Sequence, residues 1–273
     1  MATVKEEAVI LRAYDLGEAD RILVLLTPGS GIIRAVAKGI RRTKSKFGGR
    51  LEPFNRVKVV LHRGRNLHTV TGAEVLDPHP GIREDFWRYL FGEAILEAVE
   101  RGVEEGQVIP RLYTALCISL KAMESGPPLP LAAAFLLKFC ALVGYRPHLG
   151  RCLHCGERPE GSSVALDLEE GGIVCERCLK SEGGRGRLPL MTFGVISRAE
   201  WLLGQELRRI DKEEAEDQEC LSLAVDFAER FLGKKLRAAR IALNQARQGK
   251  EGAPDMGRGN TAPGKINGKR LLT

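Results

Sequence analysis

Two Cys-x2-Cys pairs constrain the fold of this chain more than any other feature of its sequence. Cys152 and Cys155 form the first pair, Cys175 and Cys178 form the second, and 19 residues separate the pairs. Two residues between thiolates let both sulfurs reach one ion, and two such pairs complete the tetrahedral shell that zinc prefers. The spacing is typical of zinc ribbons, so we predict one structural Zn2+ within a zinc finger at residues 150–182.

Disulfides and thioredoxin-like redox chemistry are the alternatives for these cysteines. The total of seven cysteines is odd, and the N-terminus lacks a signal-peptide pattern, which together favour a reducing cytoplasm. No βαβ pattern surrounds the pairs, which argues against redox chemistry. Four protein ligands leave no place for water, so the zinc should not be catalytic, and His154 should be exposed. The other cysteines lie in helical patterns and should be core residues: Cys117, Cys140 and Cys220.

The first 79 residues show the pattern of a small β domain. Apolar segments separated by Gly and Pro predict strands over residues 8–14, 21–27, 32–37, 57–61 and 68–76. A Gly-rich excursion follows the third strand. This arrangement suits a closed barrel of the OB type, and an SH3-like barrel suits the strand count nearly as well. We therefore predict an OB-fold nucleic-acid-binding domain at residues 1–79.

The pattern becomes helical at residue 83, where apolar residues recur every three to four positions. Further helices are predicted over residues 107–124, 131–143, 192–204 and 213–232. The segment 131–143 is almost entirely apolar and too short to span a membrane, so it should be a central core helix. The predicted fold class is α+β multidomain: an N-terminal OB-fold β-barrel, then an α-helical domain at 80–248 with the inserted four-cysteine zinc finger. Residues 249–273, rich in Gly, Pro, Asn and Lys, are predicted to be a disordered basic tail.

Positive charge is concentrated in residues 34–65, which hold eleven Lys and Arg against one carboxylate, whereas the whole chain nets +7. Such a field attracts polyanions, most commonly nucleic acid, although a solvated loop is the alternative. Aromatic residues are few here, which favours backbone contacts with little sequence preference. Arg56 is the one basic residue that we interpret as a possible structural salt-bridge partner. The candidate phosphate contacts are Arg34, Lys38, Arg41, Arg42, Lys44, Lys46, Arg50, Lys58, Arg63 and Arg65.

Motifs of enzymes and of membrane proteins are absent from the sequence. There is no Walker loop, no Gly-x-Gly-x-x-Gly, no Gly-x-Ser-x-Gly and no His-Glu-x-x-His, and no apolar run is long enough to cross a bilayer. These absences favour a binding protein over an enzyme, with no membrane partner.

Three groups of residues carry a family resemblance through their order and spacing. The first comprises residues 29–33, 37–42, Ser45 and 51–54, the second is Gly144-Tyr145-Arg146-Pro147 before the first cysteine pair, and the third is Phe231-Leu232-Gly233 with Leu236. Together they resemble the RecO family of bacterial recombination mediators, over roughly residues 3–245. Some members lack the four cysteines, which supports a structural zinc.

The resemblance implies an OB fold, a helical domain and an inserted zinc finger. It implies binding of single- and double-stranded DNA, annealing of complementary strands, and loading of RecA onto strands coated by single-stranded-DNA-binding protein. The implied partners are RecR and the acidic C-terminal tail of that coating protein, in the cytoplasm at the nucleoid. Alternatives from the residues are an OB-fold and zinc-ribbon RNA-binding factor, a zinc-containing interaction scaffold, and a metalloenzyme, which a complete four-cysteine shell disfavours.

Overall fold

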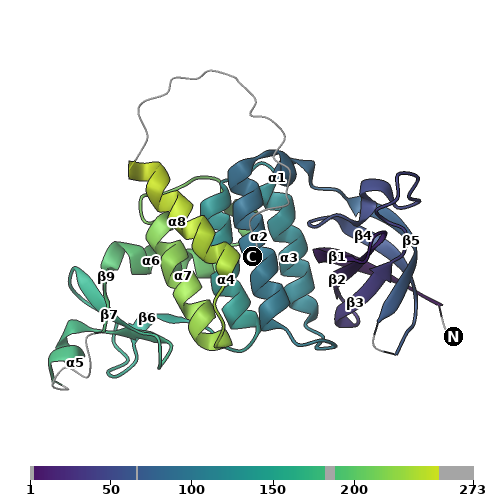
Figure 1. Cartoon of the computed structure of the whole chain (residues 1–273). Coiled ribbons are helices and arrows are strands. Elements are labelled where there is room, and N and C mark those ends of the chain that lie inside the picture. Colours follow the sequence, from purple (N-terminus) through teal and green to yellow (C-terminus); the bar gives the residue numbers. More distant parts are fainter. Residues whose placement is uncertain (1–2, 66, 182–187, 252–273) are drawn as a thin grey trace.

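The computed structural model describes residues 3–65, 67–181 and 188–251, and its N-terminal part is built of strands (Figure 1). The strands predicted from the sequence all form, and the first is longer than predicted because it begins at Thr3 and ends at Leu16. Their bounds are β1 (Thr3–Leu16), β2 (Asp20–Thr27), β3 (Gly31–Ala37), β4 (Arg56–His62) and β5 (His68–Asp77).

These strands form a closed barrel in the order β1-β2-β3-β5-β4, with β4 pairing back to β1. All pairings are antiparallel except that of β3 with β5. Alternate side chains point inward, as the period of a strand requires, and Ile10, Leu25 and Val59 are fully buried in the barrel core. The N-terminal part is thus an OB-like sheet domain.

The excursion between β3 and β4 covers residues 38–55 and contains a short 3-10 helix, η1 (Gly48–Leu51). It packs closely against the barrel, because the side chains of Ile40, Phe47 and Leu51 belong to the barrel core. Gly39 has a φ of 68°, a conformation that side-chain-bearing residues rarely adopt. The charged residues of the excursion are therefore carried on a backbone with buried anchors.

The second domain is helical, and its elements surround α4 (Figure 1). Helix α4 contacts α2, α3, α6 and α7, and most of its residues are buried, which confirms the predicted central helix. The side-chain oxygen of Thr192 caps α6 by accepting from the Val195 amide. The helices are α1 (Pro80–Glu84), α2 (Phe86–Gly102), α3 (Pro110–Met123), α4 (Pro128–Leu142), α6 (Phe193–Gly204), α7 (Asp217–Leu232) and α8 (Arg237–Glu251), with η2 (Leu207–Arg209) before α7.

Helix α8 has no counterpart among the predicted helices. The carboxylate of Glu97, in α2, accepts hydrogen bonds from the amides of Arg237 and Ala238, at 2.9 and 2.6 Å, and so caps the start of α8. The helix continues to Glu251, three residues into the stretch predicted to be a disordered tail. Residues 252–273 of that stretch lie outside the described residues. Within the described ranges, no helix has the length and apolar character needed to cross a bilayer.

One outer face of the barrel packs into the hydrophobic core of the helical domain, apart from the barrel's own core. Val9, Leu11 and Val24 of the barrel belong to the same buried cluster as the core residues of α2, α4 and α7. The amide of Gly106, in the connection from α2 to α3, donates to the Ile32 carbonyl of β3 at 3.0 Å. A Cβ at Gly31 would lie 2.1 Å from the Gln107 carbonyl oxygen, so this close approach requires glycine.

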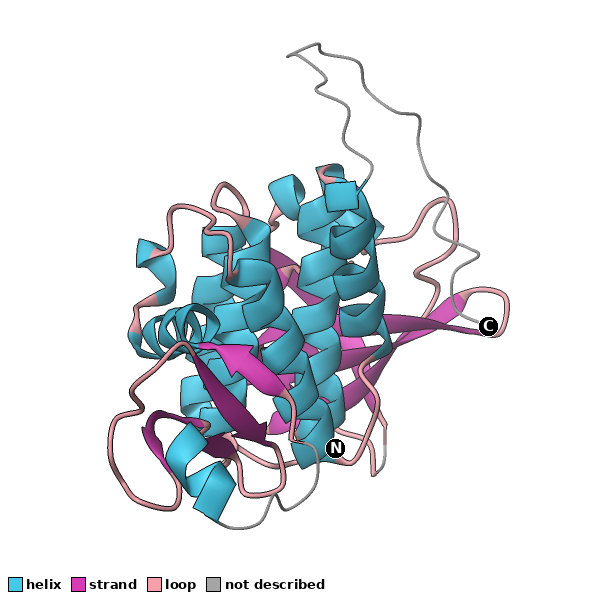
Figure 2. Ribbon diagram, turned by 90° about the vertical axis from the view of Figure 1, so that its left-hand side faces the viewer, coloured by secondary structure: helices cyan, strands magenta, loops and turns pink. Residues whose placement is uncertain are grey.

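The segment with the four cysteines forms a small sheet between α4 and α6, which faces the viewer in Figure 2. Its strands are β6 (His148–Cys152), β7 (Ser163–Asp167), β8 (Gly172–Val174) and β9 (Leu190–Thr192), in the order β6-β8-β7-β9, with helix α5 (Glu176–Ser181). Strands β7 and β8 form the antiparallel hairpin that the sequence predicts between the cysteine pairs. We call this segment, residues 148–192, the ribbon.

Candidate nucleic-acid interface and metal centre

All of the basic side chains proposed from the sequence as phosphate contacts are exposed. Arg34 lies on β3, Lys58 lies on β4, and Arg63 and Arg65 lie in the turn from β4 to β5. The others lie in the 38–55 excursion: Lys38, Arg41, Arg42, Lys44, Lys46 and Arg50. Exposure alone does not make a cation available to a phosphate, because a carboxylate or carbonyl can already hold it. The contacts of each side chain divide them into two sets.

The unpaired set has side chains with no hydrogen bond or ion pair among the described residues. It comprises Lys38, Arg42, Lys44, Lys58, Arg63 and Arg65. A free cation can exchange its counterions for a phosphate without first losing a protein partner. The unpaired set is therefore the part of the basic stretch best suited to bind a polyanion.

Arg34 and Arg41 belong to the paired set, because carboxylates from distant parts of the chain hold them. The Arg34 guanidinium forms an ion pair with Glu105, in the connection from α2 to α3. The Arg41 guanidinium lies 3.4 Å from an oxygen of Asp15 and donates to the Gly17 carbonyl at 3.0 Å. Both arginines would have to leave or share these partners to contact a phosphate.

Lys46 and Arg50 complete the paired set through backbone carbonyls. The Lys46 ammonium donates to the Thr71 carbonyl of β5 at 3.0 Å and lies 5.0 Å from the centre of the Phe47 ring. The Arg50 guanidinium donates to the Lys46 carbonyl at 2.8 Å. Neither loses its charge in these contacts, so both still add to the positive field of the barrel.

Arg56 has the structural role that the sequence interpretation gave it. Its guanidinium forms ion pairs with Glu7, at 2.8 Å, and with Asp77, at 2.7 Å. The hydrogen bond from Arg56 lowers the pKa of Glu7, and the hydrogen bond to Glu7 raises the pKa of Arg56 above its usual range. These contacts join β1, β4 and the end of β5 near the helical domain.

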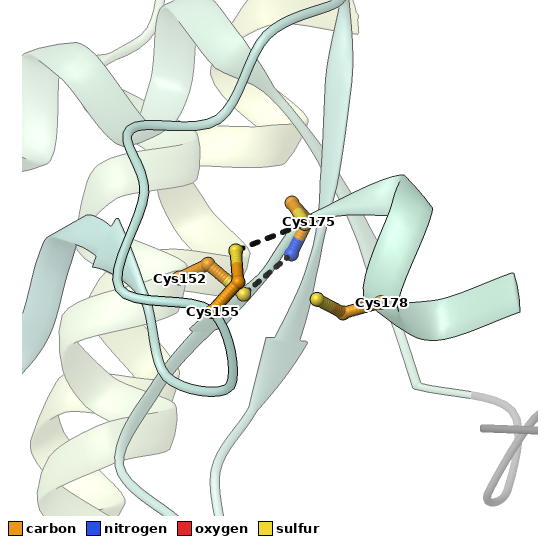
Figure 3. Close-up of side chains that lie close together, drawn as sticks. All are labelled: Cys152, Cys155, Cys175 and Cys178. Carbon is orange, nitrogen blue, oxygen red and sulfur yellow. Dashed lines mark hydrogen bonds between the residues drawn. The ribbon is translucent and has the colours of Figure 1, made fainter. Parts of the chain in front are cut away.

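The four cysteines come together as their spacing predicts (Figure 3). Their sulfurs lie within 4.8 Å of one another, and the Sγ atoms of Cys155 and Cys175 are 3.8 Å apart. Metal–sulfur bonds of about 2.3 Å in a tetrahedron place the sulfurs about 3.8 Å apart, so the donor set fits a tetrahedral metal. The Cys175 amide donates to the Cys152 sulfur at 3.3 Å, a contact that favours a thiolate.

The thiols of the cluster differ in how readily they ionise. The backbone amide of Glu157 lowers the pKa of Cys155 to about 6. A hydrogen bond with the Cys175 side chain is the main cause that raises the pKa of Cys178 to about 12, because it favours the protonated thiol. A metal binds thiolates, so binding of a divalent cation by all four sulfurs releases that proton. His154 is exposed, as expected from the complete four-cysteine shell.

The other cysteines lie in the helical domain. Cys140 and Cys220 are buried core residues, as predicted, and burial raises the pKa of each to about 12. Cys117, also predicted to be a core residue, is instead only half-buried: it packs against the edge of the core and lines a groove of about 740 Å3 between the barrel and the helical domain. Ile118, Lys121 and Arg208 also line this groove. We call it the α3 groove.

Sequence reasoning missed the carboxylates that contact the basic stretch. Asp15 and Asp20 lie near the β1–β2 turn, and Glu105 lies in the helical domain, 71 residues after its partner Arg34. The Asp20 carboxylate accepts from the Gly39 amide at 2.7 Å. No local motif signals these contacts, because they depend on how the strands and domains pack.

Comparison with known proteins identifies relatives over most of the chain. The family described as "Recombination protein O N terminal" matches residues 1–79, and "Recombination protein O C terminal" matches residues 83–240. A DNA repair protein RecO from Bifidobacterium longum is 34% identical over 248 residues, which cover 88% of this chain and 99% of that protein. A DNA repair protein RecO from Nocardioides is 42% identical over 204 residues, or 72% and 83% of the two chains. A third, from Thermobifida fusca, is 34% identical over 246 residues, or 88% and 98%.

Proposed function

This chain belongs to the RecO family, and from that premise we propose that it is a DNA-binding recombination mediator in DNA repair. In this proposal, residues 1–79 form an OB fold that binds single- and double-stranded DNA through the phosphate backbone. Residues 80–248 form the helical domain with its zinc finger. The protein anneals complementary strands and helps to load RecA onto single-stranded DNA coated by single-stranded-DNA-binding protein, at the nucleoid in the cytoplasm.

The observation that supports this function most directly is the unpaired set of cations on the barrel. Arg42 and Lys44 are exposed, charged and without a partner among the described residues, on a backbone anchored by Ile40 and Phe47. Two DNA strands repel each other through their phosphates, and a protein that neutralises phosphates on both strands lowers that barrier. Base pairing then supplies the free energy of annealing, so no nucleotide hydrolysis is needed.

An annealing assay tests the proposal. Complementary labelled strands are mixed, with and without single-stranded-DNA-binding protein, and the unaltered protein is compared with Arg41→Glu/Arg42→Glu and with Arg42→Glu/Lys44→Glu. We expect both variants to lose annealing, because the repulsion between phosphates is no longer screened. Annealing that is unchanged in both would contradict the proposal. Equal competition by RNA of the same length would indicate a general nucleic-acid binder instead.

Binding to single-stranded DNA should depend strongly on salt. If about six phosphates are contacted, log K falls against log salt with a slope of about −4. Fluorescence anisotropy with a labelled oligonucleotide between low and moderate salt measures this slope. A slope near zero would rule out backbone binding by the unpaired set.

We propose that the metal of the four-cysteine cluster is zinc and that its role is structural. The donor set is all sulfur, which suits Zn2+, and four protein ligands leave no site for water. Elemental analysis of the purified protein should give one zinc per chain. Cys152→Ser/Cys155→Ser should abolish this zinc and loosen the ribbon, since metal binding drives the folding of such modules. Retention of zinc by this variant would contradict the assignment.

We propose RecR as one partner, and the acidic C-terminal tail of single-stranded-DNA-binding protein as a second, bound in the α3 groove. The groove combines apolar lining from Ile118 and Ile210 with cations from Lys121 and Arg208. Lys121→Glu/Arg208→Glu should weaken binding of a peptide with the tail sequence and leave DNA affinity unchanged. Unchanged peptide affinity would exclude this groove as the binding site.

A further inference from the structure

The backbone that carries Arg42 and Lys44 is fixed by contacts that do not involve their own side chains. Ile40 is 8% exposed and Phe47 is 1% exposed, and both insert into the barrel core on either side of these cations. Gly39 bends the chain with a positive φ just after β3 ends. The direction in which Arg42 and Lys44 leave the barrel is thus set by a few anchoring contacts.

The strongest polar anchor comes from the start of β2. A carboxylate oxygen of Asp20 accepts the Gly39 amide hydrogen at 2.7 Å, and the neighbouring Ala19 carbonyl accepts from the Arg41 amide at 3.0 Å. A hydrogen bond to an ionised acceptor is about twice as strong as one between neutral groups. Asp20 is half-buried, so water competes for this bond less than at an exposed position.

We propose that Asp20 is a positioning residue for DNA binding. Its carboxylate holds the Gly39 amide and so keeps the backbone of residues 39–44 in the conformation that presents Arg42 and Lys44 to phosphates. This inference rests on the proposed function and goes beyond it. The negative charge of Asp20 by itself would predict that this residue weakens DNA binding, whereas the positioning role predicts that it strengthens binding. An acid beside a phosphate-binding segment repels DNA, and its removal should tighten binding.

The β1–β2 turn offers a matched control. Glu18 lies two residues before Asp20, is exposed, and has no hydrogen bond or ion pair within the described part of the chain. Glu18→Ala removes one negative charge and no contact. Asp20→Asn removes the same charge but keeps an oxygen that can accept the Gly39 amide hydrogen. Asp20→Ala removes both the charge and the acceptor.

The test measures affinity for a labelled single-stranded oligonucleotide at fixed salt. We expect Glu18→Ala to bind as tightly as the unaltered protein, or slightly more tightly, and Asp20→Asn to lie between Glu18→Ala and Asp20→Ala, because a neutral acceptor holds the Gly39 amide more weakly. Asp20→Ala should bind about tenfold more weakly, the lower end of the effect of losing a hydrogen bond to a charged group. If Asp20→Ala binds as tightly as Glu18→Ala, the positioning role is overturned.

A double-mutant cycle separates positioning from a general loss of folding. In the Arg42→Gln/Lys44→Gln background, Asp20→Ala should weaken binding by less than about twofold, because residues that act through one another are not additive. A full tenfold loss in that background would overturn the inference. If the unaltered protein shows no salt-dependent binding, the proposed function itself fails. Normal binding with no effect of Asp20→Ala removes the positioning role alone.

Discussion

The cations of the barrel that face the helical domain differ from those that face solvent. Toward the helical domain, Arg12 forms an ion pair with Glu100 at 2.7 Å, Arg34 pairs with Glu105, and Arg56 pairs with two carboxylates. Among the solvent-facing residues, Arg42 and Lys44 have no such partner within the described ranges. Some of these cations therefore hold parts of the fold together, whereas others remain available to a ligand.

This difference predicts a separation of effects. Removing Arg12 or Arg56 leaves a partly buried carboxylate without its partner, which destabilises the folded state. Removing an unpaired cation leaves no such defect, but it removes a possible phosphate contact. Variants of the two sets should therefore change different measurements, and a variant that changes both would break the comparison.

The largest effect is expected from Arg42→Glu/Lys44→Glu. Each lost contact with single-stranded DNA costs roughly fivefold in affinity at 0.1 M salt, and the added negative charges extend the loss to about 100-fold. Anisotropy measures the affinity, and thermal unfolding should be unchanged. Arg158→Glu/Lys180→Glu in the ribbon is the control, with the same change of net charge. An equal loss in this control would mean that net charge, not the barrel surface, governs binding.

Arg56→Ala should lower the stability of the protein and leave its DNA binding unchanged. The loss of both ion pairs leaves Glu7 and Asp77 without their partner, and we expect unfolding to become easier by about 2–3 kcal/mol. Chemical denaturation measures this change, and the salt slope of DNA binding should be unaltered. Lys58→Ala, two residues along the same strand, is the control and should change the slope but not the stability. A large change of slope in Arg56→Ala would place Arg56 in the unpaired set.

The third prediction concerns how stability depends on pH at the contact between the barrel and the helical domain, where Glu93 of α2 is near Arg12. Burial raises the pKa of Glu93 to about 7, and the charge of Arg12 opposes this only in part. The folded state then binds more protons than the unfolded state between about pH 4.5 and 7. The contribution of Glu93 to stability is therefore greatest at low pH and is lost as the pH rises through 7. We expect a loss of about 2 kcal/mol between pH 5 and 8 from this group.

Glu93→Gln tests that expectation, because glutamine keeps the shape of the side chain but does not ionise. The variant should be more stable than the unaltered protein at pH 8, and its stability should depend less on pH. Glu84→Gln, an exposed position before α2, should leave the pH profile as it is. If Glu93→Gln leaves the profile unchanged as well, charge at this interface does not limit stability.

The sequence predicts those parts of the molecule whose signals are local. The strands and helices follow from the regular recurrence of apolar residues along short segments. The four-cysteine cluster follows from residue spacing, because two residues between the cysteines of each pair let both sulfurs reach one ion. Helix α8 was missed because the segment is rich in Arg, Gln and Lys and reads as a polar extension, although Ala239, Ala242, Leu243 and Ala246 recur at helical spacing and are buried. The division of the basic stretch was also missed, because Asp15 and Glu105 meet their partners only through packing.

Arg34 gives the smallest effect and the sharpest test of the comparison, because it is both a candidate phosphate contact and a partner of the helical domain. If Glu105 retains Arg34 when DNA binds, Arg34→Gln leaves the salt slope unchanged, whereas Lys38→Gln lowers its magnitude by about 0.7. Glu105→Gln should then increase the magnitude by about 0.7, because it releases Arg34 to a phosphate. Anisotropy across a salt series distinguishes these outcomes. A smaller salt slope in Arg34→Gln, together with an unchanged slope in Glu105→Gln, would mean that Arg34 contacts DNA while still paired with Glu105. Pairing with a carboxylate would then not distinguish the cations that bind DNA from those that do not.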